Sequence, residues 1–271
     1  EPGIGQVVLT LGDGESMPLK RDTNRLIFGG TMLQVRNERG TLVYSKIKSK
    51  EASEKIVYNT LTVPVRERFQ LVLADGTKVF LNSGSEMRYP ERFGKARREV
   101  FLKGEAWFEV AKDSAREFWV HAGAMDVKVL GTSFNVKAYE RLETVATTLV
   151  EGSVEVACAG KSFQIVPGEQ FVYDKNNRVM DVRMVDTESY VSWKDGYYYF
   201  KREPLENIME VLSRWYDLNV FYHNQDLKRM EFGGRLKRYD DISYLLKKME
   251  ETQDVEFIIK GNTITVQRKT D

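Results

Sequence analysis

The sequence has very few of the residues that build covalent or metal-bound frameworks. Its 271 residues include one cysteine, Cys158, and two histidines, His121 and His223. A single cysteine excludes an internal disulfide framework and any zinc site of the Cys-x-x-Cys type. Two histidines that lie so far apart in the sequence do not favour a histidine-rich metal centre. The composition therefore predicts a chain that uses neither a metal nor another cofactor.

Long apolar runs are missing, and so is an excess of either charge. No stretch reaches the roughly 18 apolar residues that a membrane-spanning helix needs, and no signal segment opens the chain. The 41 basic and 40 acidic side chains nearly cancel, which argues against nucleic-acid binding, because that usually needs a basic face. The chain begins at Glu1 rather than Met. We therefore expect a mature product or a shortened chain whose targeting or anchoring segment lay upstream.

Sequence signatures of common enzymes are absent too. The chain has no Gly-x-Ser-x-Gly elbow, no His-Glu-x-x-His helix and no phosphate-binding Gly-x-x-x-x-Gly-Lys loop. Glu105 and Glu109 are four residues apart in a predicted strand, about 13 Å by strand rise, so we interpret them as solvated side chains rather than a hydrolytic pair. His121 is expected at the surface or half-buried, His223 in a loop, and Cys158 as a small buried side chain. The sequence thus favours a protein that is not an enzyme.

Short alternating strands, separated by turns, fill most of the chain. In residues 1–185 the turns recur about every 8–12 residues, which is typical of an all-β sandwich or barrel. The clearest hairpin joins residues 69–73 to residues 77–81 through Ala74-Asp75-Gly76. Residues 8–14 echo it weakly, which indicates a layered or solenoid-like architecture. A turn at Lys103-Gly104 is predicted between strands at 99–102 and 106–110.

The pattern changes to helical spacing near residue 190. One helix is predicted from the apolar residues Leu205, Ile208, Met209, Leu212 and Trp215. A second is predicted from Ile242, Leu245, Leu246 and Met249, with Asp240 and Asp241 near its start, where the helix dipole favours acids. Further strands are predicted at 197–200, 218–222, 231–236, 255–259 and 263–267.

These elements predict the order β-α-β-β-α-β-β, a compact α+β domain. We therefore predict a mainly β fold, an all-β sandwich or solenoid-like domain followed by a small α+β domain. Three segments are expected: an N-terminal β extension at 1–60, the all-β domain at 61–188 and the α+β domain at 189–271.

Several motifs resemble the FecR family of anti-sigma regulators and signal transducers. The resemblance is carried by residues 71–82, 89–90, 98–100, 104–110, 129–136 and 148–154. Trp193-Lys194-Asp195-Gly196, Pro204-Leu205 and Arg214-Trp215-Tyr216 resemble the domain that follows FecR modules in Bacteroidetes members. Structure alone also explains much of the motif, because Asp75-Gly76 closes a hairpin. Its apolar members are expected to fill a core: Phe108, Val110, Leu130 and Phe134.

The resemblance implies a transducer with three parts. A cytoplasmic helical domain holds an extracytoplasmic-function sigma factor, one helix crosses the inner membrane, and a periplasmic region receives a signal from the signalling domain of an outer-membrane TonB-dependent receptor. This chain would be the periplasmic sensor portion alone. Docking is expected on open strand edges of the C-terminal domain. The candidate contact residues are Tyr197, Tyr198, Tyr199, Thr263, Thr265 and Gln267.

The resemblance also draws attention to Gly131-Thr132. Some family members resemble self-cleaving proteins at such a bond, where the Thr132 hydroxyl would attack the carbonyl of Gly131 and the resulting ester would hydrolyse. The alternative is structural: Gly131 lets the chain turn, and Thr132 starts a strand or bonds locally. For the whole chain, a carbohydrate-binding or glycan-processing β-protein is the alternative function. It would need an exposed aromatic platform or two facing acids in a cleft.

Overall fold

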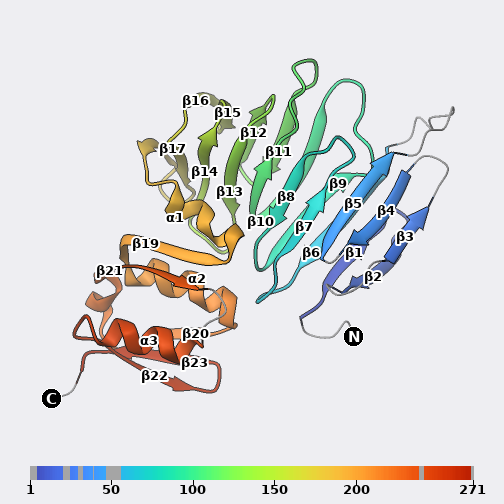
Figure 1. Cartoon of the computed structure of the whole chain (residues 1–271). Helices are drawn as coiled ribbons and strands as arrows, with labels where there is room; N and C mark the ends of the chain where they lie inside the picture. Colours follow the sequence, from blue (N-terminus) through green and yellow to red (C-terminus); the bar gives the residue numbers. More distant parts are fainter. Residues whose placement is uncertain are drawn as a thin grey trace. The chain divides into compact units, whose positions relative to one another are not determined.

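The protein folds into two compact units, residues 1–187 and residues 188–271 (Figure 1). The computed structural model describes residues 5–20, 25–29, 33–38, 40–46, 56–237 and 241–269. Unit 1 is built from strands, and unit 2 combines helices with two small sheets. The predicted fold class, mainly β with a small C-terminal α+β region, is confirmed. The three-segment division into residues 1–60, 61–188 and 189–271 stays a prediction.

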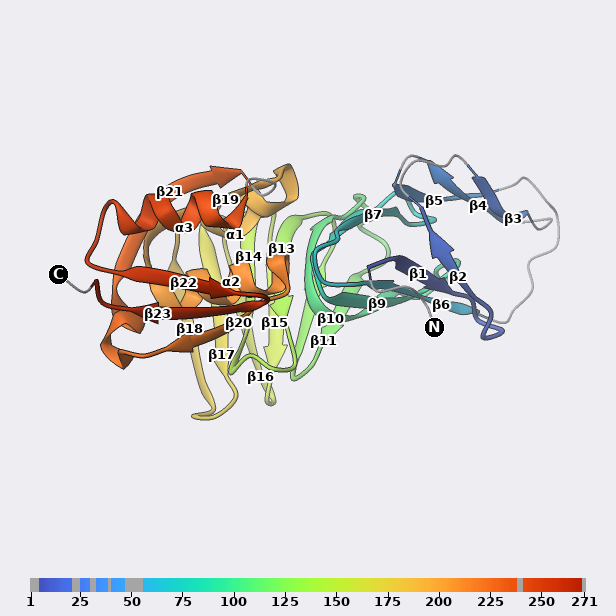
Figure 2. The ribbon, with the colours of Figure 1, turned by 90° about the horizontal axis from the view of Figure 1, so that it is seen from below.

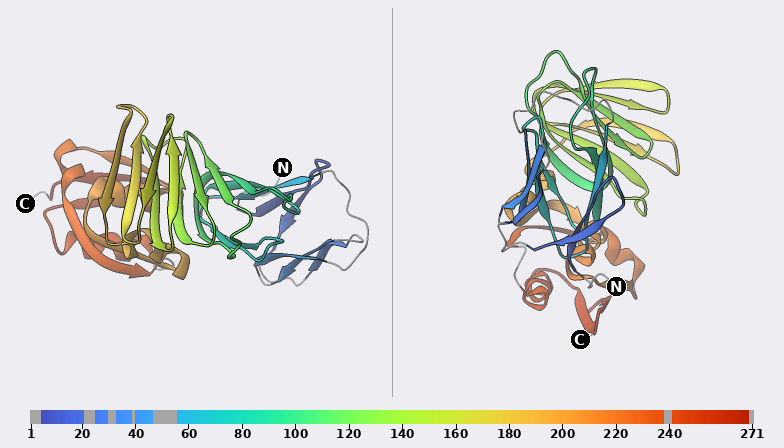
Figure 3. Two further views of the ribbon diagram at one scale, coloured as in Figure 1. Left: turned by 90° about the horizontal axis from the view of Figure 1, so that it is seen from above. Right: turned by 90° about the vertical axis from the view of Figure 1, so that its right-hand side faces the viewer.

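Unit 1 consists of two sheets that share one strand. The strand order of the first sheet is β2, β1, β6, β9, β10, β11, β12, β15, β16. The order of the second is β3, β4, β5, β7, β8, β10, β13, β14, β17, β18. Figure 2 shows the N-terminal strands of the two sheets as separate layers, and Figure 3 shows them from two other sides.

The first sheet comprises β1 (Val7–Thr10), β2 (Ser16–Leu19), β6 (Tyr58–Val63), β9 (Ser85–Pro90), β10 (Arg98–Glu109), β11 (Phe118–Ala122), β12 (Met125–Val129), β15 (Val154–Cys158) and β16 (Lys161–Ile165). The second comprises β3 (Arg25–Gly29), β4 (Leu33–Glu38), β5 (Thr41–Lys46), β7 (Phe69–Val72), β8 (Lys78–Leu81), β13 (Ser133–Ala138), β14 (Thr144–Glu151), β17 (Glu169–Asp174) and β18 (Val179–Met184), together with β10. Strands β2, β6, β9 and β18 were not predicted from the sequence.

Period-2 alternation places the core of unit 1. The rings of Phe108 and Phe134 stack inside it with centroids 5.2 Å apart, and Val110 is buried as predicted. Leu130 is 48% exposed, so the expectation that it fills the core is wrong. It follows Val129, which is buried at the end of β12, and successive side chains of an extended chain point to opposite faces.

The two segments that echo each other in sequence fold into the same turn. In each, the N–H of a glycine (Gly14 or Gly76) donates to the carbonyl three residues earlier. The preceding aspartate (Asp13 or Asp75) accepts from the N–H two residues further on. Both glycines have a positive φ, +93° and +90°, as a three-residue hairpin loop with a bulge requires. The echo therefore marks a repeated turn that joins β1 to β2 and β7 to β8.

Strand β10 runs without a break through Lys103-Gly104, where a turn was predicted. Its first half pairs with β9 and β11 in the first sheet, and its second half pairs with β8 and β13 in the second. Gly104 has a φ of +101°, and a Cβ there would lie 2.4 Å from the Ser85 hydroxyl. The glycine thus bends the strand from one sheet into the other instead of ending it.

Unit 2 contains the predicted order β-α-β-β-α-β-β. Its elements are α1 (Glu188–Val191), η1 (Ser192–Asp195), β19 (Tyr197–Pro204), α2 (Leu205–Tyr216), β20 (Asn219–Tyr222), η2 (Gln225–Arg229), β21 (Glu231–Lys237), α3 (Ile242–Glu250), β22 (Glu256–Lys260) and β23 (Thr263–Gln267). Strands β19 and β21 form an antiparallel pair, and β23 lies between β20 and β22 in a second sheet. Helices α2 and α3 lie between these sheets in Figures 1 and 2. Asp241 caps α3 by accepting from the Ser243 N–H, whereas Asp240 lies outside the described residues.

Candidate functional site

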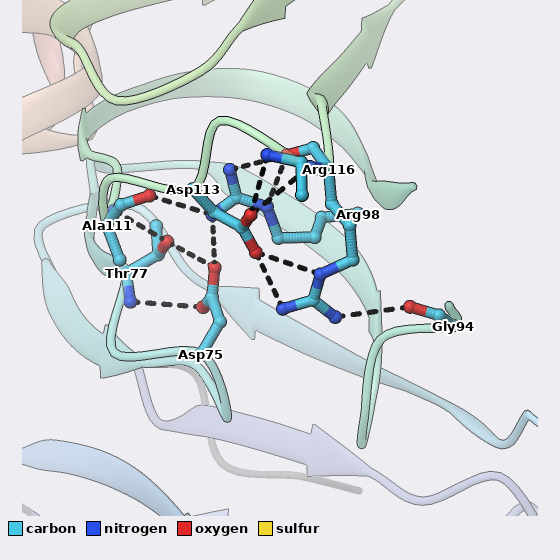
Figure 4. A network of polar contacts seen from close by, with 8 residues as sticks. Asp75, Thr77, Gly94, Arg98, Ala111, Asp113 and Arg116 are labelled. Atoms are coloured by element: carbon cyan, nitrogen blue, oxygen red, sulfur yellow. Dashed lines mark hydrogen bonds and ion pairs between the residues drawn. The ribbon is translucent and has the colours of Figure 1, made fainter. Parts of the chain in front are cut away.

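A buried polar network joins the β7–β8 hairpin to the start of β10 (Figure 4). The Arg98 side chain is fully buried, and its Nη1 donates to Asp75 Oδ2 and to the Ala111 carbonyl, 2.8 Å each. Nη2 and Nε donate to the carbonyl of Arg116 at 2.9 and 3.2 Å. The guanidinium also lies 5.4 Å from the centroid of the Phe118 ring. This buried charge is fully engaged in holding three chain segments together, so we assign it a structural role.

Asp75 has two functions in that network. Besides the hydrogen bond from Arg98, its carboxylate accepts hydrogen bonds from the N–H and the hydroxyl of Thr77, at 3.0 and 2.7 Å. The turn at Asp75-Gly76 was expected from the sequence, but the role of Arg98 was not. Period-2 alternation could have found it, because Arg98 shares the face of Val100 and Leu102, which are buried. A buried arginine requires an acidic partner.

Glu105 and Glu109 behave differently from each other. Glu105 is buried, and its carboxylate accepts from the side-chain amides of Asn82 and Asn135 at 2.7 and 3.0 Å. The expectation that it is solvated is wrong, because these amide donors replace water. Glu109 is partly exposed and lies 3.7 Å from the Lys78 ammonium. The two acids do not face each other across a cleft, as glycoside hydrolysis would need.

A row of stacked rings lies on the outer face of the first sheet. The ring centroids of Phe101 and His121 are 4.9 Å apart, and those of His121 and Trp119 are 6.2 Å apart. Arg88 lies over Phe101, and Lys128 lies over Trp119. Because the rings turn their faces to one another, they do not offer the flat platform that a sugar would stack on.

His121 and Cys158 occupy the environments that the sequence predicted. The His121 side chain is 26% exposed, and its Nδ1 lies 2.7 Å from Asp126 Oδ1. Cys158 is buried, and burial, followed by the nearby Asp126 carboxylate, raises the pKa of its thiol. A thiol that resists ionisation is a poor nucleophile. Within the described ranges, no three His, Cys, Asp or Glu side chains gather as a metal site would require. No helix in that same part of the chain is long and apolar enough to cross a membrane.

Gly131 and Thr132 form the crossing from β12 in the first sheet to β13 in the second. The buried Thr132 hydroxyl donates to the Ser153 carbonyl at 3.0 Å, and the Thr132 carbonyl accepts from the Val110 N–H at 3.0 Å. A Cβ on Gly131 would lie 2.8 Å from the Lys112 Cα, so the close approach of two backbone segments requires glycine here.

These contacts support the structural interpretation of Gly131-Thr132, and self-cleavage at this bond stays the alternative. A cavity of about 250 Å³ borders the peptide bond. It is lined in part by the charged side chains of Lys78, Glu109, Lys112 and Glu151.

The three candidate tyrosines of β19 divide between two faces. Tyr198 is buried, with its ring 6.0 Å from that of Trp215, so it packs the core of unit 2 and is unsuited to contact a partner. Tyr197 and Tyr199 are half-buried on the opposite face. The Arg235 guanidinium lies 4.3 Å from the centroid of the Tyr197 ring. The outer face of the β19–β21 pair is therefore both aromatic and cationic.

Strand β23 does not offer the open edge that was expected, because β20 and β22 pair with its two sides. Thr263, Thr265 and Gln267 instead share its outer face, since Ile264 and Val266 between them are fully buried.

Thr265 has an exposed aromatic neighbour on this face that was not expected from the sequence. Thr265 is paired with Phe221 of β20 on one side and with Ile258 of β22 on the other, and Phe221 is 63% exposed. The face of this sheet, rather than the edge of β23, is thus the accessible surface.

Comparison with known proteins gives two family matches and several similar solved structures. The model described as FecR protein matches residues 59–155, and the model described as FecR, C-terminal, matches residues 197–266. Two crystal structures of a candidate anti-sigma factor from Parabacteroides distasonis ATCC 8503 are each 29% identical, with a TM-score of 0.72. The alignments cover 78% and 79% of this chain, and 99% and 100% of the others. A search of curated proteins found no match.

Proposed function

We propose, since the chain belongs to the FecR family of anti-sigma factors, that it is the periplasmic sensor region of such a factor. In this proposal it relays a signal from an outer-membrane TonB-dependent receptor to an extracytoplasmic-function sigma factor by protein–protein contact. A helix outside this chain holds it at the inner membrane, and a cytoplasmic domain outside this chain holds the sigma factor. The chain itself carries out no catalysis.

The outer face of the β19–β21 pair is the observation that carries this proposal. Tyr197 and Tyr199 lie there opposite Lys237 and Arg235 in the antiparallel register. Tyrosine and arginine are the residue types that most often dominate the energy of protein interfaces, because they combine a large apolar surface with hydrogen-bonding groups. A row of such residues suits recognition of a folded protein surface.

Titration calorimetry with isolated receptor signalling domains tests the proposal. The domains are taken from the TonB-dependent receptors of the same genome, and the full chain is the titrand. We expect one domain to bind, and Tyr199→Ala to weaken its binding at least tenfold. Thr265→Ala, on the other sheet of unit 2, is the matched control.

The possible outcomes separate the function from the surface. If Thr265→Ala weakens binding and Tyr199→Ala does not, the receptor docks on the β20–β23–β22 face. If no signalling domain binds and immobilised polysaccharide retains the chain, the proposal fails in favour of a glycan-binding protein.

A further inference from the structure

An apolar cavity in unit 2 results from one missing side chain. In β21, Phe232, Gly234 and Leu236 point to the inner face, where Gly234 is paired with Phe200 of β19. With no side chain at position 234, a cavity of about 220 Å³ remains between β21 and α3. The apolar side chains that line it are Phe200, Ile208, Phe232, Leu236, Leu245 and Met249.

The fold does not require glycine at this place. Neither Gly233 nor Gly234 has a positive φ, and a Cβ on Gly234 would meet no atom within 4 Å. A Cβ on Gly233 would make only an ordinary contact, 3.6 Å from the Phe200 carbonyl. Two glycines inside a strand weaken it, and such glycines often mark a place where a ligand or another backbone approaches closely.

The surroundings of the cavity indicate the chemistry of its occupant. Among the described strands, β21 has a neighbour on one side only, so an extended peptide can pair with its other side. The cavity exceeds the roughly 150 Å³ that holds a benzene molecule in an engineered protein core. Lys248 and Glu251, which both line the cavity, pair with each other, and Glu250 accepts from the Phe257 N–H. The remaining charged side chains of β21 and α3 are exposed and mostly basic: Arg235, Lys237 and Lys247, against Glu231.

We propose that β21 and this cavity form a peptide-binding site for an acidic, extended segment of a protein partner. The segment adds as a strand to the open side of β21, and one large apolar side chain, of the size of leucine or phenylalanine, fills the space above Gly234. The inference rests on the proposed function in taking a protein as the partner, and it names the chemistry that the partner presents.

Two valine variants of the same strand test the site. Gly234→Val fills the cavity from within. The Gly233 backbone also lines the cavity, but alternation along the strand turns a side chain at 233 away from the face of Phe232 and Gly234, so Gly233→Val adds the same side chain outside the cavity. A displayed library of random 12-residue peptides is selected against the full chain. We expect enriched peptides to share one aromatic or branched apolar residue flanked by Asp or Glu. They should bind Gly233→Val like the parent and bind Gly234→Val at least tenfold more weakly.

A second variant and a second measurement guard against misfolding. Lys237→Glu with Lys247→Glu changes exposed side chains only, and should weaken the same peptides at least tenfold. Hydrogen exchange of the β21 amides should slow when peptide is added. Equal binding to Gly233→Val and Gly234→Val, or enrichment of basic peptides, would overturn the site. A receptor signalling domain that binds the parent and Gly234→Val equally would overturn it while leaving the proposed function intact.

Discussion

Replacement of Arg98 by alanine should severely destabilise unit 1. The change removes a guanidinium that donates to Asp75 and to the carbonyls of Ala111 and Arg116. It leaves the Asp75 carboxylate, whose side chain is 6% exposed, without its cationic partner. Breaking a buried ion pair from one side costs about 3–5 kcal/mol, because the remaining charge is neither solvated nor paired. We expect Arg98→Ala to lower the free energy of unfolding of unit 1 by an amount in this range.

Cys158 gives an assay that reports on unit 1 alone. It is the only cysteine of the chain and is buried in the core of unit 1, so a thiol reagent labels it only after unit 1 opens. The extent of labelling across a urea series gives the unfolding midpoint of that unit. Arg98→Ala should become labelled at a much lower urea concentration than the parent.

A double-mutant cycle checks the stated cause. The double variant Arg98→Met with Asp75→Asn removes both charges. Its loss of unfolding free energy should be clearly smaller than the sum of the losses of Arg98→Met alone and Asp75→Asn alone. A loss below about 1 kcal/mol for Arg98→Ala, the range of an exposed ion pair, would refute the reasoning. Additive costs in the cycle would refute it as well.

Three further predictions concern other positions of unit 1. Gly76→Ala should lower the free energy of unfolding by about 1–2 kcal/mol through its positive φ alone, whereas Gly104→Ala should lower it more, because its Cβ would also lie 2.7 Å from the Ser85 Cα. Urea unfolding compares the two variants, and equal losses would contradict the close approach. Burial raises the pKa of Tyr44 from 10.0 to about 12. The free energy of unfolding should therefore be unaffected below pH 10 and fall as the pH rises from 10 to 12, since the tyrosine ionises first in the unfolded chain. An absorbance titration checks this, and ionisation of Tyr44 near pH 10 without unfolding would contradict it. The bond between Gly131 and Thr132 should stay intact, because the Thr132 hydroxyl donates its hydrogen bond to the Ser153 carbonyl. Mass spectrometry of freshly purified protein checks this. Fragments that end at Gly131, and that disappear in Thr132→Ala, would establish self-cleavage instead.

Local patterns predicted the elements of this protein better than its long-range connections. Alternation and Asp-Gly turns located the β7–β8 hairpin, and helical spacing located α2 and α3. Lys103-Gly104 misled the prediction, because a glycine with positive φ can end a strand or bend it, and only contact with Ser85 decides between them. Similarly, the faces of Tyr197 and Tyr198 follow from alternation, but which face is covered depends on Trp215, which lies in α2.

The candidate site shows the same limit. The resemblance directed attention to β19 and β23, and Thr263, Thr265 and Gln267 do share an exposed face. That β23 is the central strand could not be known, because the parallel pairing of β20 with β23 joins segments about forty residues apart. The cavity at Gly234 depends on packing among β19, β21 and α3, which no local pattern reveals.

The sharing of β10 between two sheets has a consequence for how unit 1 can respond to force. The halves of β10 are one continuous backbone, so a load applied to the first sheet passes into the second through covalent bonds rather than through side-chain contacts. Opening either sheet at this strand disturbs the ladder of the other, which makes gradual, sheet-by-sheet loosening unfavourable. We expect unit 1 to transmit a pull as a stiff body and then to yield in one step. A stiff body of this kind passes displacement from one end of unit 1 to the other without absorbing it along the way.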